Sequence, residues 1–128
     1  MIVLGVAVAS VAAFVMSSVY YALTAPLERK ALGGAALDRG KPVAWKVVAE
    51  LLRTAVVATV FAWIASEAGW LSLPGSLVFA LVLWVGFPVV LLTGSVAWEK
   101  AAPVTAAMHA GDWLLKLLLI AVAVGALH

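Results

Sequence analysis

The segment PVTAAMHAGDWLLKLLLIAVAVGAL, residues 103–127, decides the fold, because it has the length and composition of a membrane-spanning helix and yet carries charge. Asp112 and Lys116 are opposite charges placed four residues apart within it. An ionisable group at bilayer depth costs about 2.5–3.5 kcal/mol on insertion scales, and such groups face a partner or a water-filled cavity. We therefore expect both side chains to point into the protein and to take part in its function.

The composition places the whole chain in the membrane class. Of its 128 residues, 66% are hydrophobic and 11% are charged, and the mean hydropathy is +1.19. A soluble domain has about 45–50% apolar and about 25% charged residues. The length predicts a single integral membrane domain over residues 1–128. The lack of cysteine excludes disulfides and thiol chemistry. A net charge of +2, with no basic patch outside the first loop, argues against nucleic acid as a partner.

Four segments have the roughly 20 mostly apolar residues that a spanning helix needs. They cover about residues 2–26, 44–66, 75–98 and 102–127. The first apolar run lacks a preceding basic residue and is too long for a signal peptide, so we expect it to be retained as a helix. The predicted fold is all-α, a four-helix transmembrane bundle in the lipid bilayer of the bacterial cytoplasmic (inner) membrane.

The basic residues predict the orientation of the bundle. The connection after the first span is a polar loop from Glu28 to Val43, with one interfacial helical turn as an alternative for part of it. It holds four of the eight Lys and Arg residues, and Lys100 follows the third span. The second connection, residues 67–74, has none. Because positively charged loops stay in the cytoplasm, we expect both chain termini on the outer side.

A regular series of small residues marks one face of the first span, formed by Gly5, Ala9, Ala13 and Ser17. Small residues at this spacing let two helices approach closely in lipid, and we prefer that interpretation to a lipid-facing surface. The partner is either a helix of the same chain or one of a second copy. We expect a homo-oligomer or a larger membrane complex.

Gly86 and Pro88 interrupt the third span. Proline removes one helical hydrogen bond, so a kink is predicted there. Helix breaks near mid-membrane mark binding sites in transporters. We prefer a simple packing kink, because transmembrane helices tolerate proline and only one such break is present.

Polar side chains form one stripe on the fourth span, at Thr105, His109, Asp112 and Lys116. A second stripe runs along the second span through Lys46, Glu50 and Arg53. Arg53 and Asp112 both lie about 13–16 Å inside their helix starts, so we predict that they can pair. The charges of Glu50, Arg53, Asp112 and Lys116 sum to zero, as a buried network requires. His109 can join it as a donor and acceptor.

Two interpretations of this candidate polar network remain open. It is either a closed set of ion pairs that fixes the helices, or a proton or ligand site that opens to the cytoplasm. Beyond Lys116 the fourth span is wholly apolar, and a conducting path needs polar groups in both halves, so a channel is disfavoured. We prefer a structural or interaction protein, such as an accessory subunit of a membrane complex. The alternative is a carrier or sensor of a small or lipid-like ligand near Arg53 and Asp112.

The sequence shows no catalytic motif. His109 and the terminal His128 do not have the spacing of metal ligands, and no glycine-rich phosphate loop follows a strand. We therefore expect no enzyme activity, no metal and no cofactor.

Several short motifs together resemble one family. They are Val19-Tyr20-Tyr21, Trp45-Lys46, Glu50-Leu51-Leu52-Arg53, Gly86-Phe87-Pro88, Leu92-Thr93, Trp98-Glu99, and His109-Ala110-Gly111-Asp112-Trp113 with Lys116. The chain resembles, over nearly its whole length, the small bacterial membrane proteins of domain of unknown function 1761. The resemblance implies four membrane helices and brings no activity, substrate or cofactor. Many members have Asn at the place of His109 and uncharged residues at those of Asp112 and Lys116, which implies that the charged stripe belongs to a subgroup.

Overall fold

The computed structural model describes residues 2–33 and 44–127, all of which lie in helices or short connections. The helices are α1 (Ile2–Leu32), α2 (Ala44–Ala68), α3 (Gly75–Trp84), the π-helix η2 (Val85–Val89), α4 (Val90–Trp98) and α5 (Pro103–Leu127). Because η2 joins α3 to α4, the chain has four helical segments that are long and apolar enough to cross a membrane. The prediction of an all-α bundle is confirmed, and these spans indicate a multi-pass membrane protein.

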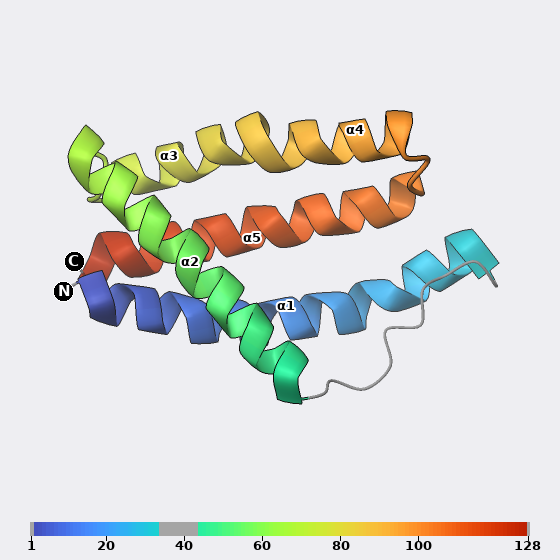
Figure 1. Ribbon diagram of the computed structural model, residues 1–128, viewed down its shortest axis with the longest axis horizontal. Coiled ribbons are helices and arrows are strands. Elements are labelled where there is room, and N and C mark those ends of the chain that lie inside the picture. The colour runs from blue at the N-terminus through green and yellow to red at the C-terminus, as the bar shows by residue number, and fades with distance from the viewer. Residues whose placement is uncertain (1, 34–43, 128) are drawn as a thin grey trace.

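Helix α5 is the centre of the arrangement (Figure 1). It lies between α1 on one side and the α3–η2–α4 segment on the other. Helix α2 crosses this layer obliquely, from beside α1 at its start to beside α3 at its end. The beginning of α1 and the end of α5 lie together, so these two helices are antiparallel.

The small-residue ridge packs α1 against α5 of the same chain. Ala9 and Ala13 are fully buried. A Cβ atom added at Gly5 would lie 3.1 Å from the Cα atom of Val124, so the two backbones nearly touch there. Close approach of this kind is what small residues permit between helices in lipid. The ridge therefore has a partner within the chain.

Helix α1 extends further than the sequence predicts. The first span was expected to end near residue 26, before a polar loop with at most one helical turn, but the helix continues without a break through Pro26 to Leu32. The carboxylate of Glu28 is buried, with 1% of the residue exposed, and accepts a 2.6 Å hydrogen bond from the Thr105 hydroxyl. This contact holds the last turns of α1 against α5 and offsets the hydrogen bond that proline removes. The rest of that predicted loop, residues 34–43, lies outside the described residues.

Helix α2 ends at a glycine cap. Gly69 has φ 78°, a left-handed conformation that glycine adopts without strain. Its N–H donates to the carbonyl of Ser66 over 3.3 Å, and the N–H of Trp70 donates to that of Ala65 over 2.7 Å. These two bonds form a Schellman motif, which stops the helix and turns the chain toward α3.

The main cluster of buried apolar side chains among the described residues occupies one half of the bundle. Its buried side chains come from the start of α1, the second half of α2, α3, and the second half of α5, and include Ala9, Ala58, Phe61, Ala62, Ala65, Ala80, Leu117, Ile120, Ala121 and Val124. The rings of Phe61 and Phe79 lie 4.9 Å apart and join α2 to α3 there. Helix α2 runs away from α4 toward its own start (Figure 1). The polar side chains from Thr105 to Lys116 lie in the first half of α5, outside this cluster.

The break in the third span takes the form of a π-helix. Both Gly86 and Pro88 lie within η2, and the helix continues into α4. Proline has no N–H to donate, and a wide π-turn is one way for a helix to continue past it. Pro88 is half-buried, whereas Phe87 on the same turn is exposed.

Candidate functional site

The polar stripe of α5 faces α1, and side-chain hydrogen bonds connect the two helices along its length. Thr105 donates to Glu28 Oε2 (2.6 Å), the Tyr21 hydroxyl lies 2.6 Å from His109 Nδ1, and Ser17 donates to Asp112 Oδ1 (2.7 Å). Because the helices are antiparallel, rising positions on α1 meet falling positions on α5. The residues of the stripe thus have partners on α1 that are spaced to match them.

The four charged residues of the predicted network form a continuous chain of ion pairs. Lys116 Nζ lies 2.9 Å from Asp112 Oδ2 on its own helix and 3.9 Å from Glu50 Oε2 on α2. Glu50 also pairs, through Oε1, with the guanidinium of Arg53 one turn later on α2. Signs alternate along this chain, so each charge lies beside an opposite one. The pair between the buried Lys116 and Glu50 links α2 to α5.

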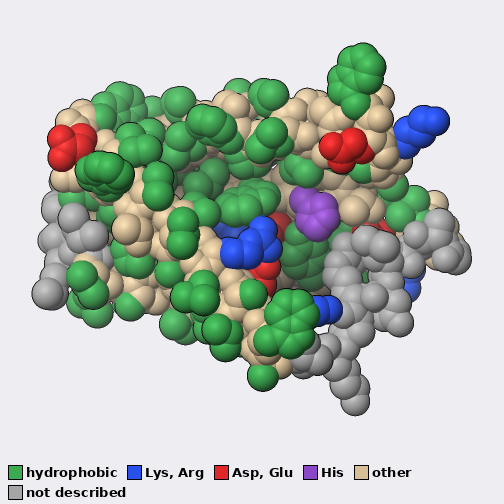
Figure 2. All heavy atoms as spheres, viewed as in Figure 1, with side chains coloured by type: hydrophobic (Ala, Val, Ile, Leu, Met, Phe, Trp, Pro, Cys, Tyr) green, Lys and Arg blue, Asp and Glu red, His purple; other side chains and the backbone are tan. Residues whose placement is uncertain are grey.

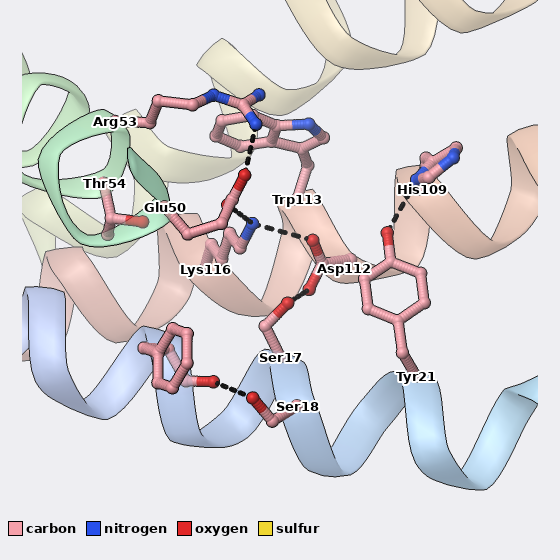
Figure 3. A pocket seen from close by; sticks show the side chains of 11 residues that line it. Ser17, Ser18, Tyr21, Glu50, Arg53, Thr54, His109, Asp112, Trp113 and Lys116 are labelled. Carbon is pink, nitrogen blue, oxygen red and sulfur yellow. Dashed lines mark hydrogen bonds and ion pairs between the residues drawn. The ribbon is translucent and has the colours of Figure 1, made fainter. Parts of the chain in front are cut away.

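The predicted direct pair between Arg53 and Asp112 is not formed. Arg53 pairs with Glu50, and Asp112 pairs with Lys116 and Ser17 (Figure 3). The two residues do lie near the same depth and line one cavity, as their distances from the helix starts indicate. The prediction of this pair was wrong, because Glu50, and not Arg53, is the residue of α2 that meets the charges of α5.

Exposure rises steadily along the network. The exposed fraction of the side chain is 3% for Asp112, 9% for Lys116, 40% for Glu50 and 66% for Arg53. The Asp112 end is therefore sealed between α1 and α5, whereas the Arg53 end is open. The network is therefore buried at one end only.

The open end of the network borders a cavity of about 350 Å³ between α1, α2 and α5. Its lining includes all five predicted network residues, Glu50, Arg53, His109, Asp112 and Lys116. The other lining residues were not predicted for this role: Phe14, Ser17, Ser18, Tyr21, Thr54 and Trp113. Figure 3 shows these side chains converging from the three helices. Figure 2 shows one face of the molecule, mostly covered by hydrophobic side chains, with basic groups and a histidine gathered in a hollow near its centre.

Two contacts to the backbone of α5 hold the helices around this cavity. The indole N–H of Trp84 on α3 donates to the Ala110 carbonyl over 2.8 Å, and the Tyr20 hydroxyl of α1 donates to the Met108 carbonyl over 2.7 Å. Tyr20 lies against Gly111, where any side chain would meet its ring. The signal for this contact in the sequence is a glycine next to Asp112 on α5, together with a pair of tyrosines on α1.

Trp113 has a different environment from Trp84. Its ring lines the cavity, and Lys116 Nζ lies 4.9 Å from the ring centroid. A cation at this distance is attracted by the π-system, so Trp113 helps to hold the Lys116 ammonium beside Glu50 and Asp112. Within residues 2–33 and 44–127, no group of three or more His, Cys, Asp or Glu side chains could hold a metal ion.

Comparison with known proteins places the chain in a family. No curated protein and no solved structure matches it. The family described as "Protein of unknown function (DUF1761)" matches residues 4–125, which include every residue of the ion network and of the cavity. The chain, a four-helix apolar bundle with an ion pair between α2 and α5, therefore belongs to the DUF1761 family.

Proposed function

We propose that this protein is a membrane-embedded carrier or sensor that binds a small ligand in the cavity between α1, α2 and α5. The observation that supports this most is the open end of the network, where Arg53 and Glu50 border a cavity of about 350 Å³. Sites for small molecules have volumes of about 300–1,000 Å³ and contain a few polar groups among apolar ones. We propose binding rather than catalysis, because ion pairs can position a ligand without changing it.

Arg53 has the capacity to bind a further group. One guanidinium nitrogen pairs with Glu50, and its other N–H groups have no partner among the described residues. A guanidinium has five N–H donors in a fixed planar arrangement, which suits two-point binding of a carboxylate or phosphate. Arg53 is therefore the residue through which we propose that the ligand is held.

The packed half of the bundle favours a binding site over a conducting path. Beyond Lys116, the side chains of Leu117, Ile120 and Val124 are buried in the apolar core. A conducting path needs polar groups or water across both halves of the membrane. A cavity that ends at a packed core instead suits a ligand that enters and leaves on one side.

We further propose that the cavity lies in the cytoplasmic half of the bacterial inner membrane. The positive-inside rule supports this, since the basic end of α1 and the α4–α5 turn that holds Lys100 lie at one end of the bundle, and α2 runs away from that end (Figure 1). Both chain termini would then lie on the outer side.

The second candidate is a structural role, as an accessory subunit or as one copy of a homo-oligomer. It is favoured by the Asp112 end of the network, where a buried carboxylate is held by both Lys116 and Ser17 and so ties α1 to α5. Such a network specifies which helix faces meet. The two roles are compatible, because one end of the network is sealed and the other is open.

The proposed function is tested by asking which small molecules remain bound to the purified protein. Mass spectrometry of an organic extract should find one compound at a fixed ratio to the wild-type chain. Ser18→Leu, which fills the cavity from an exposed position on α1, and Arg53→Gln should both lose that compound. Lys46→Gln removes a charge from the same helix outside the cavity and should retain it. Equal retention by all four proteins would contradict the proposal, as would a wild-type extract without such a compound.

A further inference from the structure

A second cavity, of about 410 Å³, adjoins the polar one and is almost wholly apolar. It lies between α2, α5 and the bent third span, and its lining includes Val57, Leu83, Phe87 and Leu117. Trp113 lines both cavities. One side chain therefore borders both a space lined by charges and a space lined by hydrocarbon.

The two cavities are offset along α2 and α5. On α2 the polar cavity includes Arg53 and the apolar one Val57, one turn further along; on α5, Trp113 is followed one turn later by Leu117. On the third span the apolar cavity also reaches Leu91 and Leu92 in α4. The two cavities therefore lie side by side around Trp113, with the charged one against α1 and the apolar one against the third span. An amphiphile has the same division, with a charged headgroup joined to an apolar chain.

The helix break in the third span supplies part of the apolar cavity. Phe87 and Pro88, both in η2, line it. A π-turn is wider than an α-turn and moves its side chains relative to a straight helix, and such turns are frequent at functional sites. The kink therefore does more than accommodate proline, because it forms one wall of this space.

We infer that the ligand is a single-chain amphiphile with an anionic headgroup, a carboxylate or a phosphate. This rests on the proposed function of the polar cavity. The headgroup pairs with the N–H groups of Arg53 that have no partner among the described residues, and the chain passes Trp113 into the apolar cavity. Anionic charge complements Arg53, because the other cation of the cavity, Lys116, already has two carboxylate partners. A neutral headgroup would leave these guanidinium donors without a charged acceptor.

Quenching of Trp113 fluorescence by brominated amphiphiles tests this inference. The protein is placed in lipid nanodiscs and titrated with three probes that share a dibrominated stearyl chain. The headgroups are a carboxylate, a phosphate monoester and a neutral alcohol. The signal of a Trp113→Phe variant is subtracted to isolate Trp113 from the other five tryptophans. Thermal unfolding of each variant confirms that it is folded.

Saturable quenching by the carboxylate or the phosphate probe is expected, and whichever saturates at lower concentration identifies the headgroup. The alcohol should bind roughly tenfold or more weakly, since it lacks a charge-assisted hydrogen bond. Arg53→Gln should remove the preference for the anionic probe, while Lys46→Gln should keep it. Val57→Phe should weaken all three probes by reducing the apolar cavity. Leu91→Phe, at an exposed position of the same wall, does the same if Val57→Phe fails to fold.

The possible failures separate this inference from the proposed function. Equal saturation by alcohol and acid would overturn the anionic headgroup. Quenching that never saturates, and that is the same in Arg53→Gln, would contradict the claim that the ligand is an amphiphile. In either case, an Arg53-dependent compound in the organic extract would leave the proposed binding function standing. If there is neither saturable quenching nor an Arg53-dependent compound in the extract, both the amphiphile and the proposed binding function are contradicted.

Discussion

The Ser17 hydroxyl donates a 2.7 Å hydrogen bond to the buried carboxylate of Asp112. Ser17 is the last member of the small-residue ridge of α1, after Gly5, Ala9 and Ala13. Its side chain is short, so it reaches α5 only because the ridge brings the two helices together. The packing of small residues and the placement of the ion network thus depend on the same helix contact.

Removal of this hydroxyl should destabilise the protein. Ser17→Ala leaves one oxygen of a buried carboxylate without its donor, at an expected cost of about 1–2 kcal/mol. Ser18→Ala is the matched control, because the Ser18 hydroxyl is exposed and bonds only to the Phe14 carbonyl of its own helix. Denaturant unfolding in detergent measures both. Equal effects of the two substitutions would show that the contact to Asp112 contributes no stability.

The Asp112–Lys116 pair should behave as a coupled unit. Asp112→Asn or Lys116→Met alone leaves a buried partner charge and should cost about 3 kcal/mol or more. The double variant should lose less stability than the two single variants lose in total. Glu99→Gln and Lys100→Met, at exposed positions between α4 and α5, form the control cycle and should show no coupling. Additive losses at Asp112 and Lys116 would contradict the pairing.

Gly111 should tolerate no side chain while Tyr20 is present. The Cβ atom of Gly111→Ala would lie 3.2 Å from Tyr20 Cζ and closer still to its hydroxyl, which bonds the Met108 carbonyl. We expect a loss of about 1–3 kcal/mol from overpacking. The loss should be smaller in a Tyr20→Phe background, which lacks the hydroxyl.

Gly94→Ala is the control for that substitution, because nothing lies within 4 Å of an added Cβ atom there. It should leave stability unchanged or raise it by up to about 1 kcal/mol. If Gly94→Ala and Gly111→Ala destabilise equally, helix backbone effects rather than Tyr20 explain the loss.

The orientation can be measured directly, because the chain contains no cysteine. Single variants Glu67→Cys and Lys100→Cys place one thiol at each end of the bundle, both at exposed positions. By the positive-inside rule, a membrane-impermeant maleimide added to intact cells should label Glu67→Cys and not Lys100→Cys. The reverse pattern would place the polar cavity in the outer leaflet.

Helical periodicity predicted correctly that His109, Asp112 and Lys116 share one face of α5, since 3.6 residues per turn determine this within a helix. It did not show which helix that face meets. We expected α2, whereas Ser17, Tyr21 and Glu28 of α1 are the main partners. These three residues also lie on one helical face, so a search for matching polar stripes on antiparallel helices would have found them.

Other features depend on tertiary packing that a single sequence does not reveal. Pro88 predicts a break but not a π-turn, because several local geometries can accommodate a missing N–H. Both cavities border α2, which crosses the other helices obliquely (Figure 1). Crossing angles depend on which side-chain ridges interlock, and several angles suit the same apolar sequence.

A crystal structure grown from a lipidic mesophase tests the central claim most directly, since it shows whether a ligand occupies the space beside Arg53. We predict elongated density whose polar end contacts the Arg53 guanidinium and whose remainder passes Trp113 toward Leu117. A cavity closed by the side chains of Arg53 and Glu50, with α2 packed against α5 along its whole length, would contradict it.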